Sequence, residues 1–140
     1  MPTPPRRPPI ETVEPQPCFV VAHTLAVELA GAVGADPRHR GELVGVALVI
    51  GEWLAAQGWP GRWDRVVPAK VLRALGPISE EERTSFLLSL VALVGYAGLN
   101  RDIPARSAAA ILDQAKRATQ SELLTLFVRS TQHQLAQMLT

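Results

Sequence analysis

The chain has 140 residues, of which 47% are hydrophobic and 19% are charged, and its formal net charge at pH 7 is +1. This length suits one domain with a buried core, and so small a net charge gives no overall reason to expect nucleic acid, an anionic membrane or an acidic substrate as a partner. A charged fraction below the usual value of about 25% leaves few charges to cover the surface, which favours an oligomer or a bound partner.

Cysteine usage and the N-terminal residues indicate a reducing, cytoplasmic location. Cys18 is the only cysteine, so the chain has neither an internal disulfide nor a multi-cysteine metal site. Arg6 and Arg7 precede an apolar run, as they would in an export signal. Prolines crowd the residues before that run, and His23 and Glu28 interrupt it, which argues against export.

Residues 1–17 are predicted to form an extended tail. They contain seven prolines, which fix the backbone angle φ and remove hydrogen-bond donors, so that helix and sheet are both excluded. Pro5 and Pro8 have the PxxP spacing that aromatic-lined grooves bind. The alternative is a solvated arm, or a strap lying on the domain.

A first helix is predicted over residues 18–33 and ends at Gly34, which can adopt a left-handed conformation. Its polar strip is narrow and contains Thr24, Glu28 and Gly31. One apolar stripe follows the three-to-four spacing of a buried helix face. The stripe consists of Cys18, Ala22, Leu25, Leu29 and Val33.

A second helix is predicted from Pro37, with Asp36 as its N-cap, to Gln57. It is rich in small residues, including Gly41 and Gly45, which favour positions where another backbone approaches closely. Gly58 ends this helix. An irregular segment and a short helix over residues 68–75 follow it.

The central segment, residues 79–100, is the most apolar part of the chain. It opens with a capping box at Ser79 and Glu82, and between residues 86 and 99 only Ser89 and Tyr96 can form side-chain hydrogen bonds. The run is too short for a bilayer, which needs about 20 apolar residues. We therefore expect this helix and the second one to be innermost in a helical bundle.

Two further helices are predicted before the C-terminus. Asn100 is expected to cap in a left-handed conformation, Asp102 and Pro104 to begin the fifth helix, and residues 119–122 to form a second capping box. The last helix carries a four-three seam that Phe127 widens, and residues 135–139 could face either the chain's own core or a twin subunit. The seam consists of Leu124, Val128, Thr131, Leu135 and Met138.

No alternating strand pattern is present, so the sequence predicts an all-α fold. The expected architecture is a compact bundle of five or six helices over residues 18–140, forming a single domain, with the Pro-rich extended tail before it.

The candidate interaction site is the basic, tryptophan-containing segment over residues 58–76. All three tryptophans of the chain fall within eleven residues, and four basic residues sit among or just after them against one acid. These residues could anchor a protein partner or stack on nucleic-acid bases, or the tryptophans could fold inward with their indole N–H groups bonded to loop carbonyls. The candidate site residues are Trp59, Arg62, Trp63, Arg65, Lys70 and Arg73.

A helix-turn-helix role for residues 68–93 is disfavoured, because the second helix would begin with three glutamates that repel phosphate. No catalytic, cofactor-binding or metal-binding motif is found. His23 and Glu52 could meet across the bundle as a perturbed pair, and the alternative is a purely structural contact.

The sequence therefore favours a non-enzymatic helical interaction or regulatory module that binds another protein or itself. It predicts no cofactor, small-molecule substrate or membrane partner. The alternative is a nucleic-acid-binding accessory protein that uses the segment 58–76.

Overall fold

The computed structural model describes residues 18–139. Over that range the chain forms six α-helices, one short 3-10 helix and no strand, which confirms the all-α prediction. The predicted Pro-rich tail lies outside the described residues. The elements are α1 (Cys18–Val33), α2 (Pro37–Ala56), the 3-10 helix η2 (Trp63–Arg65), α3 (Pro68–Leu75), α4 (Glu80–Leu99), α5 (Ala105–Arg117) and α6 (Glu122–Gln137).

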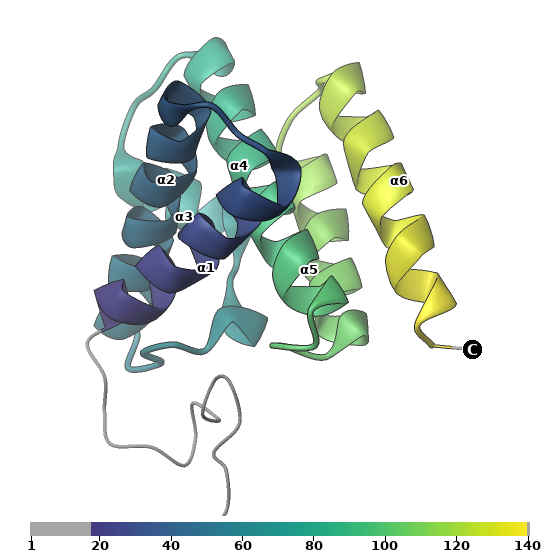
Figure 1. The fold of residues 1–140 in the computed structure, drawn as a ribbon. Helices are drawn as coiled ribbons and strands as arrows, with labels where there is room; N and C mark the ends of the chain where they lie inside the picture. Colours follow the sequence, from purple (N-terminus) through teal and green to yellow (C-terminus); the bar gives the residue numbers. More distant parts are fainter. Residues whose placement is uncertain (1–17, 140) are drawn as a thin grey trace, which may run out of the picture.

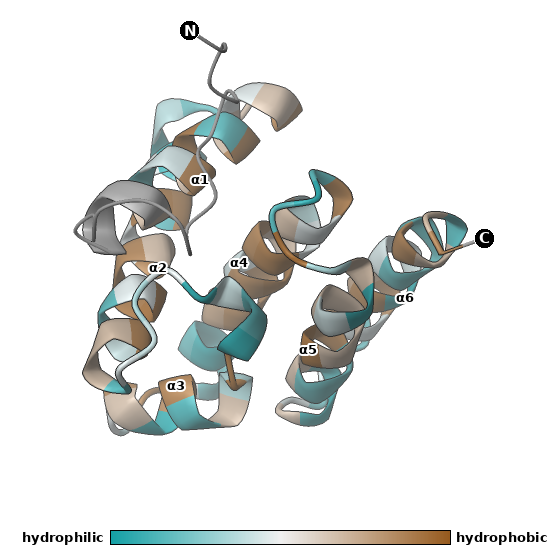
Figure 2. Ribbon diagram, turned by 90° about the horizontal axis from the view of Figure 1, so that it is seen from below, coloured by the Kyte–Doolittle hydropathy of each residue, from teal (hydrophilic) through white to brown (hydrophobic). Residues whose placement is uncertain are grey.

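Helix α4 is the centre of the bundle. It lies between α1 and α2 on one side and α5 and α6 on the other (Figure 1 and Figure 2), and it contacts every other α-helix. Because its apolar residues occupy most of its circumference, it needs neighbours on several sides to keep them from water. Its buried residues are Leu87, Leu90, Val91, Leu93, Val94, Gly95, Ala97 and Gly98.

Helix α2 is not innermost, contrary to the prediction. Ile50 and Leu54 face the core, but Gly41, Gly45 and Glu52 lie on an exposed face. A Cβ atom added at Gly41 or Gly45 would meet nothing within 4 Å, so these glycines do not serve a close helix contact within the part of the chain that the structure describes.

Close helix packing occurs instead at two glycines of α4. A Cβ added at Gly95 would lie 2.6 Å from Thr131 Cγ2 of α6. A Cβ added at Gly98 would lie 2.6 Å from Ala108 Cβ of α5 and 2.9 Å from Leu135 Cδ2 of α6. These positions let α5 and α6 approach the α4 backbone more closely than any larger residue permits.

Two predicted helix starts are confirmed. The Ser79 hydroxyl accepts a hydrogen bond from the Glu82 N–H at 3.1 Å, and Glu82 Oε1 accepts one from the Ser79 N–H at 3.4 Å. At α2, Asp36 Oδ1 accepts a hydrogen bond from the His39 N–H at 2.9 Å. Each carboxylate also lies where the helix dipole favours a negative charge.

The predicted helix boundaries on either side of α5 are wrong in detail. Arg101, with φ of 63°, adopts the left-handed conformation expected of Asn100. Pro104, not Asp102, occupies the position before α5. At α6 the N-cap is Ser121, whose hydroxyl accepts from the Leu124 N–H at 3.2 Å.

The predicted seam of α6 is confirmed at Leu124, Val128, Thr131 and Leu135, which are all buried. Phe127 does not widen it, because this side chain is 37% exposed on the outer side of the helix. On α1 the predicted stripe is buried at Ala22, Leu25 and Leu29 but ends before Val33, which is 65% exposed.

Candidate interaction surfaces

The tryptophan segment is folded by glycines and then by two short helices. Gly58 and Gly61 have φ of 84° and 75°, a region that other residues rarely adopt, and they turn the chain between α2 and η2. Pro68 then occupies the first turn of α3, where a missing N–H is tolerated. This arrangement brings Trp63 against the body of the bundle.

Trp63 is part of the core. It is 3% exposed, and its 3-10 helix packs against α2 and α5. The predicted bond from its indole N–H to a loop carbonyl is absent, since Nε1 has no hydrogen-bond partner among the described residues. Trp63 is therefore unavailable to a ligand, and it carries an unsatisfied buried donor.

Trp59 is half-buried and has neighbours on its ring. Its ring centroid lies 6.3 Å from that of Trp53 at an interplanar angle of 67°, an edge-to-face arrangement. The Arg65 guanidinium carbon lies 5.2 Å from the same centroid, within cation–π range. Contacts within the chain thus already use the aromatic surface that base stacking would need.

Arg62 is paired with Asp64 through two parallel hydrogen bonds. Arg62 Nε donates to Asp64 Oδ1 at 3.0 Å, and Nη2 donates to Oδ2 at 2.9 Å. The side-chain hydrogen bond from Arg62 lowers the pKa of Asp64 from its ordinary value. The pair stabilises the turn into η2 and neutralises one of the four basic groups of the segment.

The remaining two candidates, Lys70 and Arg73, are exposed on α3. The structure therefore does not assemble the six candidate residues into one surface. It brings Trp59 together with Arg65, directs Arg62 to Asp64 and buries Trp63.

A second surface, on α6, was not identified from the sequence. Leu123, Leu126 and Phe127 are 64%, 61% and 37% exposed, and Ser130 continues the same face. We call these four residues the α6 outer face. The sequence does contain a signal for this surface: Leu126, Phe127 and Ser130 follow Leu123 by three, four and seven residues. This spacing places a second stripe on the helix beside the buried seam.

Contacts with α4 and α5 fix the orientation of this face. Thr131 and Leu135 pack on the two α4 glycines, and Gln132 Nε2 donates to the Ala109 carbonyl of α5 at 3.1 Å. With this side of α6 held on the bundle, the α6 outer face points away from it, at the edge of the molecule (Figure 1).

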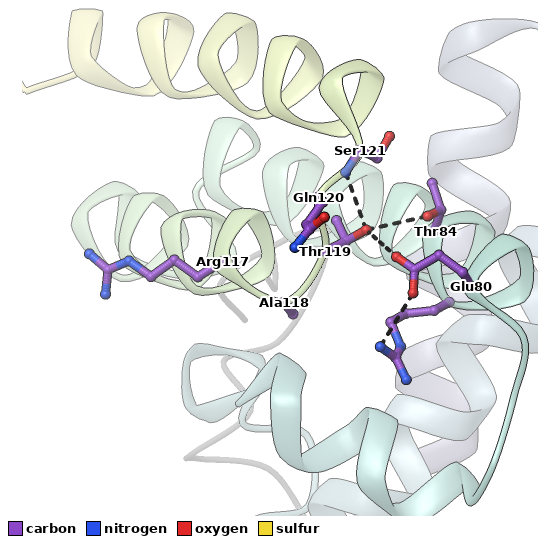
Figure 3. A pocket seen from close by; sticks show the side chains of 8 residues that line it. Glu80, Thr84, Arg117, Ala118, Thr119, Gln120 and Ser121 are labelled. Atoms are coloured by element: carbon purple, nitrogen blue, oxygen red, sulfur yellow. Dashed lines mark hydrogen bonds and ion pairs between the residues drawn. The ribbon is translucent and has the colours of Figure 1, made fainter.

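A polar pocket of about 570 Å³ lies where the starts of α4 and α6 meet the end of α5 (Figure 3). Thr119 is central to it: its hydroxyl donates to Glu80 Oε1 at 3.1 Å and lies 3.4 Å from Thr84 Oγ1. Thr119, which was predicted to cap α6, therefore connects the start of α6 to α4 instead. The lining residues are Glu80, Arg83, Thr84, Arg117, Ala118, Thr119, Gln120 and Ser121.

Both arginines of this pocket are paired with carboxylates of the chain. Arg83 Nη1 lies 3.4 Å from Glu80 Oε2, and Arg117 Nη2 lies 2.7 Å from Asp113 Oδ2. The Arg117 side chain also extends away from the pocket in Figure 3. The pocket is therefore a junction of bonded side chains, and both of its lining arginines are already paired within the described residues.

His23 and Glu52, the pair considered for acid–base chemistry, are both exposed, and no hydrogen bond or ion pair joins them. Within residues 18–139, no group of three or more histidine, cysteine, aspartate or glutamate side chains could hold a metal ion.

None of the helices described has the combination of length and apolarity needed to cross a bilayer. No protein family model, curated protein or solved structure matches this chain.

Proposed function

We propose that this chain is a non-enzymatic interaction module that binds another protein chain through the α6 outer face. The observation that carries the proposal is the exposure of Leu123, Leu126 and Phe127 on one side of one helix. Large apolar side chains gathered on a single exposed face are typical of protein contact sites.

The charge pattern supports this proposal. Residues 123–128 contain no charged side chain, although the neighbouring positions Glu122 and Arg129 are charged and exposed. Depletion of charge at the centre with polar groups at the rim is the composition of protein interfaces. A helix face of this kind can pack against another helix through three-to-four spaced side chains.

The tryptophan segment gives less support to the nucleic-acid alternative. Base stacking needs an accessible aromatic face, whereas Trp63 is buried and Trp59 contacts Trp53 and Arg65. Lys70 and Arg73 alone would supply salt-dependent attraction without base contacts.

The proposal is tested by site-specific photo-cross-linking in extracts of the source cells. A photoreactive phenylalanine analogue replaces Leu126 in one variant and Ala55 in a matched control. Ala55 is also exposed but belongs to α2, on the opposite side of the bundle (Figure 1). We expect discrete covalent adducts at position 126 and none at position 55. The absence of adducts at position 126 would contradict the proposal.

A further inference from the structure

We infer that the occupant of the α6 outer face is a second copy of this chain, bound through an antiparallel α6–α6 contact around a two-fold axis near Leu126. This inference rests on the proposed function, since it names the partner of the same surface. A two-fold contact requires a self-complementary face, and three features of α6 meet that requirement.

The first feature is the spacing of the side chains. Leu123 and Ser130 are seven residues apart, with Leu126 and Phe127 between them, which is the pattern of a helix that packs lengthwise on another helix. Around an axis near Leu126, this leucine meets its own copy, and Leu123 meets the region of Ser130. The small Ser130 side chain allows the two helices to approach.

The second feature is the absence of charge on the face itself. A two-fold axis places residues near it opposite their own copies, so a charged centre would bring like charges together. The α6 outer face has leucine, phenylalanine and serine at these positions, and none of them carries a charge.

The third feature is a pair of opposite charges on one flank. Glu122 and Arg129 are seven residues apart and therefore lie along the same edge of the face. Neither of them makes an ion pair with any residue in the described range. Both side chains are exposed.

Only an antiparallel arrangement uses these two charges. In an antiparallel helix pair the same edges meet, so Glu122 of each copy faces Arg129 of the other, twice across the two-fold axis. In a parallel pair each edge meets the opposite edge, where Glu122 would face Phe127 and Arg129 would face Gln134. Charge complementarity thus selects both the partner and the direction.

The contact is small. The face from residue 123 to residue 130 is about 10 Å long and a helix is about 10 Å wide, so the area that each copy can bury is far smaller than the roughly 800 Å² per partner of a standard stable interface. We therefore expect a reversible dimer with a dissociation constant on the order of 10 µM, rather than a permanent one.

The experiment is sedimentation equilibrium on the 140-residue chain from micromolar to submillimolar concentration. The weight-average mass of the wild type should rise from that of one 15.1 kDa chain toward that of two. Leu126→Glu should stay monomeric. Glu122→Arg should weaken association about tenfold, because each of the two flanking pairs becomes a repulsion.

The double variant Glu122→Arg with Arg129→Glu should regain association, because it restores both pairs in reversed order. The double variant still carries Glu122→Arg at the start of α6, so a regained association cannot come from repair of that helix end. Circular dichroism checks that every variant is helical. Val33→Ser, at an exposed apolar residue outside α6, serves as the control and should associate like the wild type.

A wild type that stays monomeric over this range overturns the inference. So does a double variant no better than Glu122→Arg alone, because the antiparallel pairing requires recovery. If adducts at position 126 then contain only other proteins, the proposed function stands and the second copy is not the partner. A monomer without adducts refutes both.

Discussion

At the residue scale, Trp63 combines a large buried surface with an unsatisfied N–H group. Truncation to alanine should lower the free energy of unfolding by about 3 to 5 kcal/mol, because it leaves a cavity where η2 packs against α2 and α5. Trp63→Phe should cost much less, since it keeps a ring in the site and removes the unpaired donor. Urea unfolding at 25 °C gives the free energy of unfolding of both variants and of the wild type.

The comparison of the two variants separates the packing of the ring from hydrogen bonding by the indole N–H. If Trp63→Ala remains as stable as the wild type, Trp63 does not support the core and the buried position is wrong. If Trp63→Phe is as damaging as Trp63→Ala, the indole N–H has an acceptor outside the described contacts.

Asp64 provides a pH-dependent prediction. Its hydrogen bonds from Arg62 lower its pKa in the folded state, so the carboxylate contributes stability above the unfolded pKa of about 3.9 and loses it as pH falls through the folded pKa. Asp64→Asn should therefore cost about 0.5 to 1 kcal/mol at pH 7, a modest value because the Arg62 side chain is 37% exposed.

The same variant should approach the wild type in stability below about pH 4, as Asp64 becomes protonated in the wild type. Thermal unfolding at a series of pH values gives this difference directly. A gap between the two proteins that widens toward low pH would show that the pair is not the source of the stability.

Residue-level chemistry in the tryptophan segment was only partly predictable. The sequence shows that Trp59, Trp63 and the basic residues are neighbours in the chain, but not which ring turns inward. Burial of Trp63 depends on surfaces of α2 and α5 that are distant in sequence. Pairing of Arg62 with Asp64 is local, and their two-residue separation could have indicated it.

At the scale of the helices, two glycine substitutions should have opposite effects. Gly98→Ala places a Cβ 2.6 Å from Ala108 and 2.9 Å from Leu135, so α5 or α6 must shift, at a cost of about 1 to 3 kcal/mol. Gly45→Ala meets nothing within 4 Å and should stabilise the chain by about 0.5 to 1 kcal/mol through helix propensity. Urea midpoints of the two variants test this contrast.

Destabilisation by Gly45→Ala would contradict the exposed position of that face of α2. A neutral Gly98→Ala would mean that the contacts among α4, α5 and α6 are looser than the distances indicate.

These glycines also show why helix positions were more predictable than helix environments. The capping residues Asp36 and Ser79 act on backbone groups three residues away, so local sequence determines them. The role of Gly98 depends on Ala108 and Leu135, which only the packed bundle brings near. The role of Thr119 could not be predicted for the same reason, because its hydroxyl bonds to Glu80, which is 39 residues away in the sequence.

At the scale of the whole molecule, the low charge content is distributed unevenly. The central α4 has no charged residue from position 84 to 99. A helix that is apolar around most of its circumference must be surrounded by other elements, so its central position could be predicted from these residues alone. Helix α6 has one apolar seam buried on α4 and α5 and a second apolar face exposed. Packing within the bundle accounts for the first of these, whereas the second has no partner among residues 18–139.

An association through that second face makes stability depend on concentration. A second copy that binds only the folded state stabilises it by mass action, by about 1.4 kcal/mol when the partner is at ten times its dissociation constant. For a chain of this size that increment raises the unfolding temperature by about 3 to 6 °C. The wild type should therefore melt at a higher temperature as its concentration is raised, whereas Leu126→Glu should melt at one temperature throughout. Differential scanning calorimetry over a hundredfold concentration range measures the melting temperatures of both proteins. If the two proteins melted at the same temperature at every concentration, association through the α6 outer face would not stabilise the folded state, and the prediction would be wrong.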